Sequence, residues 1–177
     1  MTVAHMLQFI ATGDHKLMRK LNSWPAPRWV RFWALAATRA GDGWLWYATG
    51  LLVLLFGREM RWAAVAAAGS AALIGAAVFV SIKRISGRKR PCEIAPHCWA
   101  TLLPPDRFSF PSGHTITAFA VGITFGLFFP SLMPVMLFFA VSIALSRVLL
   151  GMHFLSDVVA GAALGTVVGV ASFTVFA

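Results

Sequence analysis

The sequence predicts an all-α integral membrane protein, a bundle of five to six transmembrane helices preceded by an amphipathic interfacial helix. Of its 177 residues, 59% are hydrophobic and only 12% are charged, whereas a soluble domain carries about a quarter charged residues. Five apolar stretches recur along the chain, most of them close to the roughly 20 residues that a helix needs to cross a bilayer. We therefore expect one membrane-embedded domain over residues 1–177.

The N-terminal segment, residues 1–42, differs from the rest of the chain. Its apolar residues alternate with polar groups at helical spacing, and its cations stand beside tryptophans, as in segments that lie among lipid headgroups. We interpret it as interfacial. The alternative is a short sixth span over residues 29–42, but Arg31, Arg39 and Asp42 would be costly in lipid. The segment lacks the pattern of a cleaved signal peptide.

The transmembrane core is predicted over residues 43–177. Glycines spaced four residues apart, at Gly161, Gly165 and Gly169 and at Gly122 and Gly126, let helix backbones approach closely. We interpret them as packing within one bundle; a role in dimerisation is the alternative, and the oligomeric state stays open. The expected spans are 43–57, 62–82, 114–130, 132–150 and 154–177.

Three polar blocks interrupt the apolar core. The first is Lys83-x6-Arg90-Pro91, the second Pro111-Ser112-Gly113-His114, and the third Ser146-Arg147-x5-His153-x3-Asp157. They stand at the end of the second span, the start of the third, the end of the fourth and the start of the fifth. Because successive spans alternate in direction, all three blocks are expected on the same face of the membrane.

Their side chains suit the handling of a phosphoryl group. At i and i+4 of a helix, His153 and Asp157 would share a face, so Asp157 can accept a hydrogen bond from one ring nitrogen and leave the other free to attack. A buried histidine paired with an acid would explain only these two residues. An intramembrane carboxylate such as that of Asp157 indicates function by default.

The second block adds a helix start that can bind phosphate. Ser112 is placed to cap the helix, His114 can donate a proton, and exposed backbone N–H groups favour an anion. Lys83, Arg90 and Arg147 would contact the phosphoryl oxygens. The cations of residues 83–90 could instead form a patch for anionic lipids. We expect no nucleic-acid partner despite the net charge of +9, because the cations cluster near span ends and no nucleic-acid module accompanies them.

In order and spacing, the three blocks resemble the signature of the type 2 phosphatidic acid phosphatase family, over residues 83–157. The resemblance implies that His153 forms a phosphohistidine, that Asp157 orients it and that His114 protonates the leaving oxygen. It also implies that Lys83, Arg90, Ser112, Gly113 and Arg147 bind the phosphoryl group, and that the reaction needs no metal or other cofactor.

The expected function is therefore a metal-independent membrane lipid phosphatase. Candidate substrates are undecaprenyl diphosphate or another polyprenyl diphosphate, phosphatidylglycerophosphate, phosphatidic acid and the 1-phosphate of lipid A. A lipid-to-lipid phosphotransferase and a non-catalytic lipid-phosphate binding or transport protein are the alternatives. The positive-inside rule would put the basic loop 83–107 in the cytoplasm. Because those cations are partly explained by catalysis, we follow the resemblance, which implies a bacterial inner membrane with the site facing the periplasm or outer surface.

Two cysteines, Cys92 and Cys98, lie in the loop after the second span. In an oxidising compartment they could form a disulfide, and two free thiols are the alternative. With His97 they offer only three possible metal ligands, all in one short loop, so we do not expect a metal site there.

Overall fold

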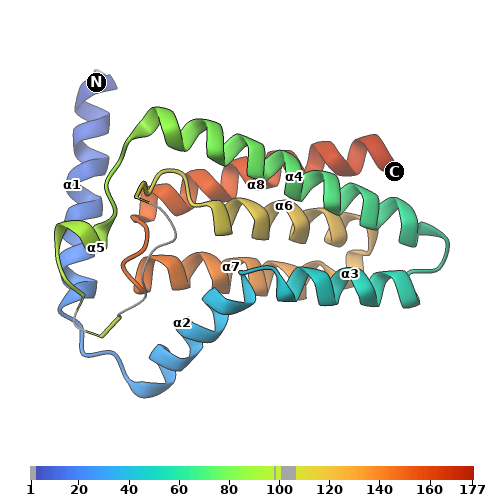
Figure 1. The fold of residues 1–177 in the computed structure, drawn as a ribbon, viewed down its shortest axis with the longest axis horizontal. Helices are drawn as coiled ribbons and strands as arrows, with labels where there is room; N and C mark the ends of the chain where they lie inside the picture. Colours follow the sequence, from blue (N-terminus) through green and yellow to red (C-terminus); the bar gives the residue numbers. More distant parts are fainter. Residues whose placement is uncertain (1–2, 98, 101–106) are drawn as a thin grey trace.

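A computed structural model describes residues 3–97, 99–100 and 107–177, in which the chain forms helices and one isolated bridge between Lys89 and Phe108. Long helices lie side by side and bring distant parts of the sequence together (Figure 1). The all-α prediction is thus confirmed. The helices are α1 (Val3–Asn22), α2 (Arg28–Ala40), α3 (Trp44–Phe56), α4 (Arg61–Ser86), α5 (Pro91–Ile94), α6 (Gly113–Phe128), α7 (Met133–Leu149) and α8 (Leu155–Phe176), with 3-10 turns at Arg58–Met60 and Pro130–Leu132.

Helix α6 is the centre of the bundle. It packs against α4, α7 and α8, and buried residues recur along its whole length. The amino acids facing it are small, including Ala64, Ala67, Ala71 and Gly75 of α4. Because small side chains let helix backbones approach, α6 is enclosed closely enough to hold its N-terminal residues in fixed positions.

The glycine repeats serve packing inside this bundle, as predicted. A methyl group at Gly161, Gly165 or Gly169 of α8 would come within 2.4 to 2.9 Å of a backbone oxygen of the Ser112–Ala120 stretch. Gly126 is also close to the start of α7, because a methyl group there would lie 2.5 Å from Sδ of Met133, whereas one at Gly122 would make an ordinary contact 3.5 Å from the Met136 carbonyl oxygen. The α6–α8 contact therefore depends on the absence of side chains, and it fixes where the first turn of α8 lies.

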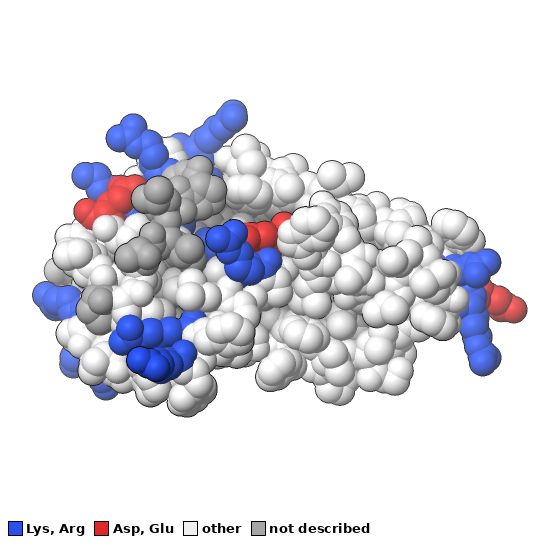
Figure 2. All heavy atoms as spheres, turned by 60° about the horizontal axis from the view of Figure 1, so that its bottom comes forward, with Lys and Arg blue, Asp and Glu red and all other residues white. Residues whose placement is uncertain are grey.

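Three of the described helical segments are long and apolar enough to cross a membrane, namely Arg58–Ser86, Pro130–Leu149 and Leu155–Phe176. The other two expected spans, α3 and α6, are shorter apolar helices. The outward faces carry large apolar residues such as Leu73, Phe138 and Val167. On the face shown in Figure 2, Lys and Arg are scattered over one half of the molecule and recur at the opposite tip, with a broad band of uncharged side chains between them. These features suit a helix bundle surrounded by lipid.

The N-terminal segment is divided into two helices that break between Asn22 and Arg28. Helix α1 lies across the end of the bundle rather than along it, near the start of α8 (Figure 1), which agrees with an interfacial element. Helix α2 packs on α7 and buries Val30, Ala34 and Thr38. Its 13 residues span about 20 Å, too little to cross the hydrocarbon core.

Candidate active site

The three polar blocks surround one cavity at the end of the bundle that α1 covers. Its volume is about 410 Å³, enough for a phosphate with part of its ester group. Six of the eight catalytic and phosphate-binding residues predicted from the sequence line it, while Ser112 and Asp157 lie fully buried behind its wall. The lining residues are Gly41, Asp42, Gly43, Trp46, Phe79, Lys83, Arg90, Gly113, His114, Thr117, Arg147 and His153.

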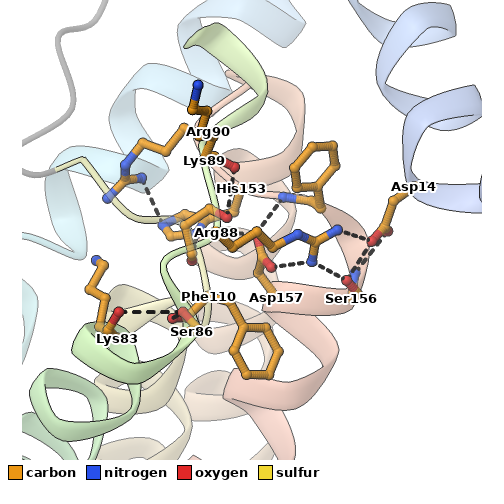
Figure 3. Close-up of polar contacts among 12 residues, drawn as sticks. Asp14, Lys83, Ser86, Arg88, Lys89, Arg90, Phe110, His153, Ser156 and Asp157 are labelled. Carbon is orange, nitrogen blue, oxygen red and sulfur yellow. Dashed lines mark hydrogen bonds and ion pairs between the residues drawn. The ribbon is translucent and has the colours of Figure 1, made fainter. Parts of the chain in front are cut away.

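His153 lies in the loop before α8, with one ring nitrogen anchored and the other turned to a cation. Its Nδ1 is 2.6 Å from the carbonyl oxygen of Ser109, and its Nε2 is 3.1 Å from Nη1 of Arg90 (Figure 3). A carbonyl can only accept, so Nδ1 carries the proton and Nε2 keeps its lone pair. Burial lowers the pKa of His153 to about 3, so the ring is neutral and nucleophilic at neutral pH.

Asp157 does not make the hydrogen bond to His153 that the i, i+4 spacing predicts. Its Oδ2 is 3.7 Å from Nδ1, beyond hydrogen-bonding distance, and accepts the backbone N–H of Phe154 at 2.8 Å instead. The reason is the helix boundary: α8 begins at Leu155, so His153 precedes the helix and the helical spacing does not apply. Ser109 holds the imidazole tautomer, and Asp157 holds the loop beside it.

An ion-pair chain leads from Asp157 to the N-terminal segment. Nη1 of Arg88 donates to Asp157 Oδ1 at 2.6 Å, and Nη2 donates to Asp14 Oδ2 at 2.7 Å (Figure 3). Neither Asp14 nor Arg88 was a predicted site residue. A sequence signal existed for Asp14, since it is an acid on the same helical face as the apolar residues Ile10, Leu17 and Met18.

His114 faces a second carboxylate that the sequence analysis did not assign to the site. Its Nε2 is 2.8 Å from Oδ1 of Asp42, in the turn between α2 and α3. The chain approaches closely there, because a methyl group at Gly41 would lie 3.1 Å from the His114 ring. The Asp42 carboxylate orients the imidazole and favours its protonated form, whereas burial and the neighbouring Arg147 act against protonation.

The three predicted cations are all buried at the cavity. Arg90 donates through Nη1 to the carbonyl oxygen of Met152 at 2.8 Å, and Nη1 of Arg147 donates to the hydroxyl of Thr38. Nζ of Lys83 lies 5.4 Å from the centre of the Phe79 ring, within range of a cation–π interaction. These contacts hold three positive charges around one small space, which favours an anionic ligand.

Ser112 occupies the N-cap position of α6, but it makes no side-chain capping hydrogen bond. Its hydroxyl accepts a hydrogen bond from Thr115 Oγ1 at 2.9 Å, and its backbone N–H donates to the carbonyl oxygen of Asp157. The predicted cap is therefore wrong, whereas the helix start is where it was expected. Backbone N–H groups of the first turn, at Gly113 and His114, have no partner within the helix and suit an anion.

The predicted disulfide involves Cys98, which lies outside the described residues, so the pairing stays a prediction. Cys92 is half-buried in α5, where burial raises its pKa. Among the described residues, no group of three His, Cys, Asp or Glu side chains is arranged to hold a metal ion.

Fold and site together define an integral membrane protein that handles phosphoryl groups, and comparison with known proteins agrees. Residues 62–177 match the model of the PAP2 superfamily. A decaprenylphosphoryl-5-phosphoribose phosphatase of Mycobacterium tuberculosis is 37% identical over 127 residues, 72% of this chain and 68% of the relative. A lipid A 1-phosphatase of Rhizobium johnstonii is 34% identical over 100 residues, 54% of this chain and 41% of the relative. The chain belongs to the PAP2 superfamily and is a multi-pass membrane lipid phosphatase.

Two solved structures share the fold. A PAP2-type phosphatidylglycerolphosphate phosphatase from Bacillus subtilis aligns with a TM-score of 0.72 and 21% identity, over 94% of this chain and 85% of the other. LpxE of Aquifex aeolicus aligns with a TM-score of 0.72 and 24% identity, over 90% and 93%. The alignments extend over nearly the whole chain, well beyond residues 62–177.

Proposed function

We propose that the protein removes a terminal phosphate from a lipid with a long hydrocarbon chain, foremost a polyprenyl-linked phosphate, through a phosphohistidine on His153. The observation that carries this proposal is the state of His153, whose Nδ1 is held by the Ser109 carbonyl while its Nε2 lone pair meets Arg90 at the cavity. A site that only bound phosphate would need no nucleophile in this state.

In the first step, Nε2 of His153 attacks phosphorus and the bond from phosphorus to the lipid oxygen breaks. His114, held by Asp42, gives its proton to that oxygen. On binding, a phosphoryl oxygen takes over the Arg90 N–H that His153 now occupies, which frees the nucleophile. Lys83, Arg90 and Arg147 stabilise the charge on the transferring group.

In the second step, water attacks phosphorus and the bond to Nε2 breaks, releasing phosphate. His114 now accepts the proton of the water, reversing its first role. His153 returns to its neutral form with the proton still on Nδ1. The two histidines therefore suffice for the proton balance of both steps.

An apolar groove beside the site supports a lipid substrate. Between α3 and α4 lies a space of about 340 Å³ whose lining includes Leu51, Leu54 and Val65. Trp46 lines both this groove and the polar cavity. A hydrocarbon chain in the groove would thus place its phosphate among the cations. The phosphatase of M. tuberculosis named above, which acts on a decaprenyl-linked phosphate by its name, makes a polyprenyl chain the first choice.

We place the protein in the bacterial inner membrane with the site on the outer side, following the family resemblance, and one short basic turn fits this orientation. The turn between α3 and α4, at the opposite end of the bundle, exposes Arg58 and Arg61, as expected of a short cytoplasmic loop. Labelling of a Glu59→Cys variant that also carries Cys92→Ser and Cys98→Ser, in intact cells, tests this orientation. An impermeant thiol reagent should not reach that residue; rapid labelling would reverse the assignment.

The decisive experiment measures phosphate release by purified protein, in chelator, from a panel of polyprenyl-linked phosphates, phosphatidylglycerophosphate, phosphatidic acid and lipid A 1-phosphate. His153→Ala should lose about a thousandfold or more in turnover, because the nucleophile is gone. His5→Ala, which removes an exposed histidine of α1, is the matched control and should behave as wild type. Undiminished turnover in His153→Ala would refute the mechanism.

A further inference from the structure

Helix α1 is joined to the site by a buried carboxylate. The side chain of Asp14 is 4% exposed and that of Asp157 is fully buried, with Arg88 between them. Ser156 strengthens the junction, because its backbone N–H donates to Asp14 Oδ1 at 3.1 Å and its hydroxyl accepts from Arg88 Nη1 at 2.7 Å. The interfacial helix is thus bonded to the first turn of α8, immediately beyond the nucleophile.

The charges along the ion-pair chain alternate in sign, from Asp14 through Arg88 to Asp157. Asp157 lies 3.7 Å from Nδ1 of His153, where its negative charge stabilises the positive ring that forms when Nε2 is phosphorylated. Arg88, at 2.6 Å from the other oxygen of Asp157, weakens that field. Asp14 offsets Arg88 in turn, so the guanidinium is shared between two carboxylates and Asp157 keeps more of its effect.

Arg88 is also fixed in place from a third side. Its guanidinium lies over the ring of Phe154, 4.2 Å from the ring centre, and Phe154 is the residue whose N–H donates to Asp157. A guanidinium has a planar set of donors. That of Arg88 donates to two carboxylates and one hydroxyl, and its face packs on an aromatic ring. Losing one carboxylate would let Arg88 turn and would change the position of Asp157.

We propose that Asp14 and Arg88 are positioning residues for the phosphohistidine step, so that the interfacial helix α1 completes the active site. Neither residue lines the cavity or touches the substrate. Their effect passes through Asp157 to His153. The inference rests on the proposed role of His153 as nucleophile and extends it to a part of the chain, residues 1–42, that carries none of the three polar blocks.

Asp14→Asn keeps the shape of the side chain and removes its charge. We expect kcat to fall about tenfold, the size of one charge-assisted hydrogen bond, while KM and competitive inhibition by orthophosphate stay unchanged, because the cavity is untouched. Rapid-quench labelling should locate the loss in the rate of phosphohistidine formation. Glu59→Gln makes the same chemical change at an exposed acid of the opposite end and should leave all these values unchanged.

A double-mutant cycle separates positioning from general support of the fold. In an Arg88→Gln background, Asp14→Asn should cost little more, because the route from Asp14 to Asp157 is already broken. An equal tenfold loss in both backgrounds would overturn the proposal, as would wild-type kcat in Asp14→Asn. So would a loss that follows the melting temperature of the variants and disappears when the assay is cooled. Normal turnover in His153→Ala would instead refute the proposed function on which this inference rests.

Discussion

Replacing Asp42 by asparagine tests whether His114 is the proton donor. The carboxylate accepts from Nε2 of His114 at 2.8 Å, with side-chain exposures of 42% for Asp42 and 22% for His114. A buried charge-assisted hydrogen bond contributes about 1.5–3 kcal/mol, but solvent reduces exposed pairs to about 0.2–1 kcal/mol. For this partly exposed pair we take about 1 kcal/mol, which corresponds to roughly a fivefold loss of rate.

The loss should depend on the leaving group, because protonation matters most for a poor one. Asp42→Asn should lower phosphate release about fivefold from a lipid alkyl phosphate and hardly at all from p-nitrophenyl phosphate. His114→Ala should show the same pattern with a larger loss. The comparison is a ratio of kcat/KM values for the two substrates in each variant. An equal loss on both substrates would mean that Asp42 only shapes the cavity, and the assignment of His114 as acid would fall with it.

Two further predictions concern pH and packing. With the pKa of His153 lowered to about 3, kcat/KM corrected for substrate ionisation should show no acid limb near pH 6.5. An acid limb of kcat/KM near pH 6.5 would contradict a buried, neutral His153. Because the unfolded chain binds a proton at His153 in this range and the folded chain does not, the free energy of unfolding should fall as pH drops from about 6.5 toward 3. Gly165→Ala should cost about 1–3 kcal/mol, measured as a lower melting temperature, because its methyl would lie 2.4 Å from the Ile116 oxygen, whereas Gly69→Ala meets nothing within 4 Å and should cost nothing.

The helix bundle could be predicted because hydrophobic stretches of membrane length are a strong signal. Alternation of the spans was enough to bring Lys83, His114, Arg147 and His153 to one cavity, and the structure lines it with all four. The family followed from the spacing of the three polar blocks. What these arguments use is the order of residues and the length of segments, both of which are explicit in a sequence.

The polar groups that contact the site residues were harder to predict from the sequence. The Ser109 contact with His153 uses a backbone carbonyl, which every residue possesses, so no residue type marks it. Asp157 was assigned to His153 on a helical spacing that fails because the helix starts two residues later. Asp14 and Asp42 come from the N-terminal segment, whose role as an interfacial element explained its composition without any need for catalysis.

The central helix α6 is also short, and this affects how the enzyme meets its membrane. Its 16 residues extend about 24 Å, against a hydrocarbon thickness of about 30 Å. With α6 centred in an undisturbed bilayer, Gly113 and His114 at its N-terminus would lie about 3 Å inside the hydrocarbon core. Either the bilayer thins around the bundle or the substrate phosphate descends into a recess, and both have an energetic cost that rises with acyl-chain length. We therefore expect membrane thickness to affect turnover independently of the chemistry of the lipid headgroup.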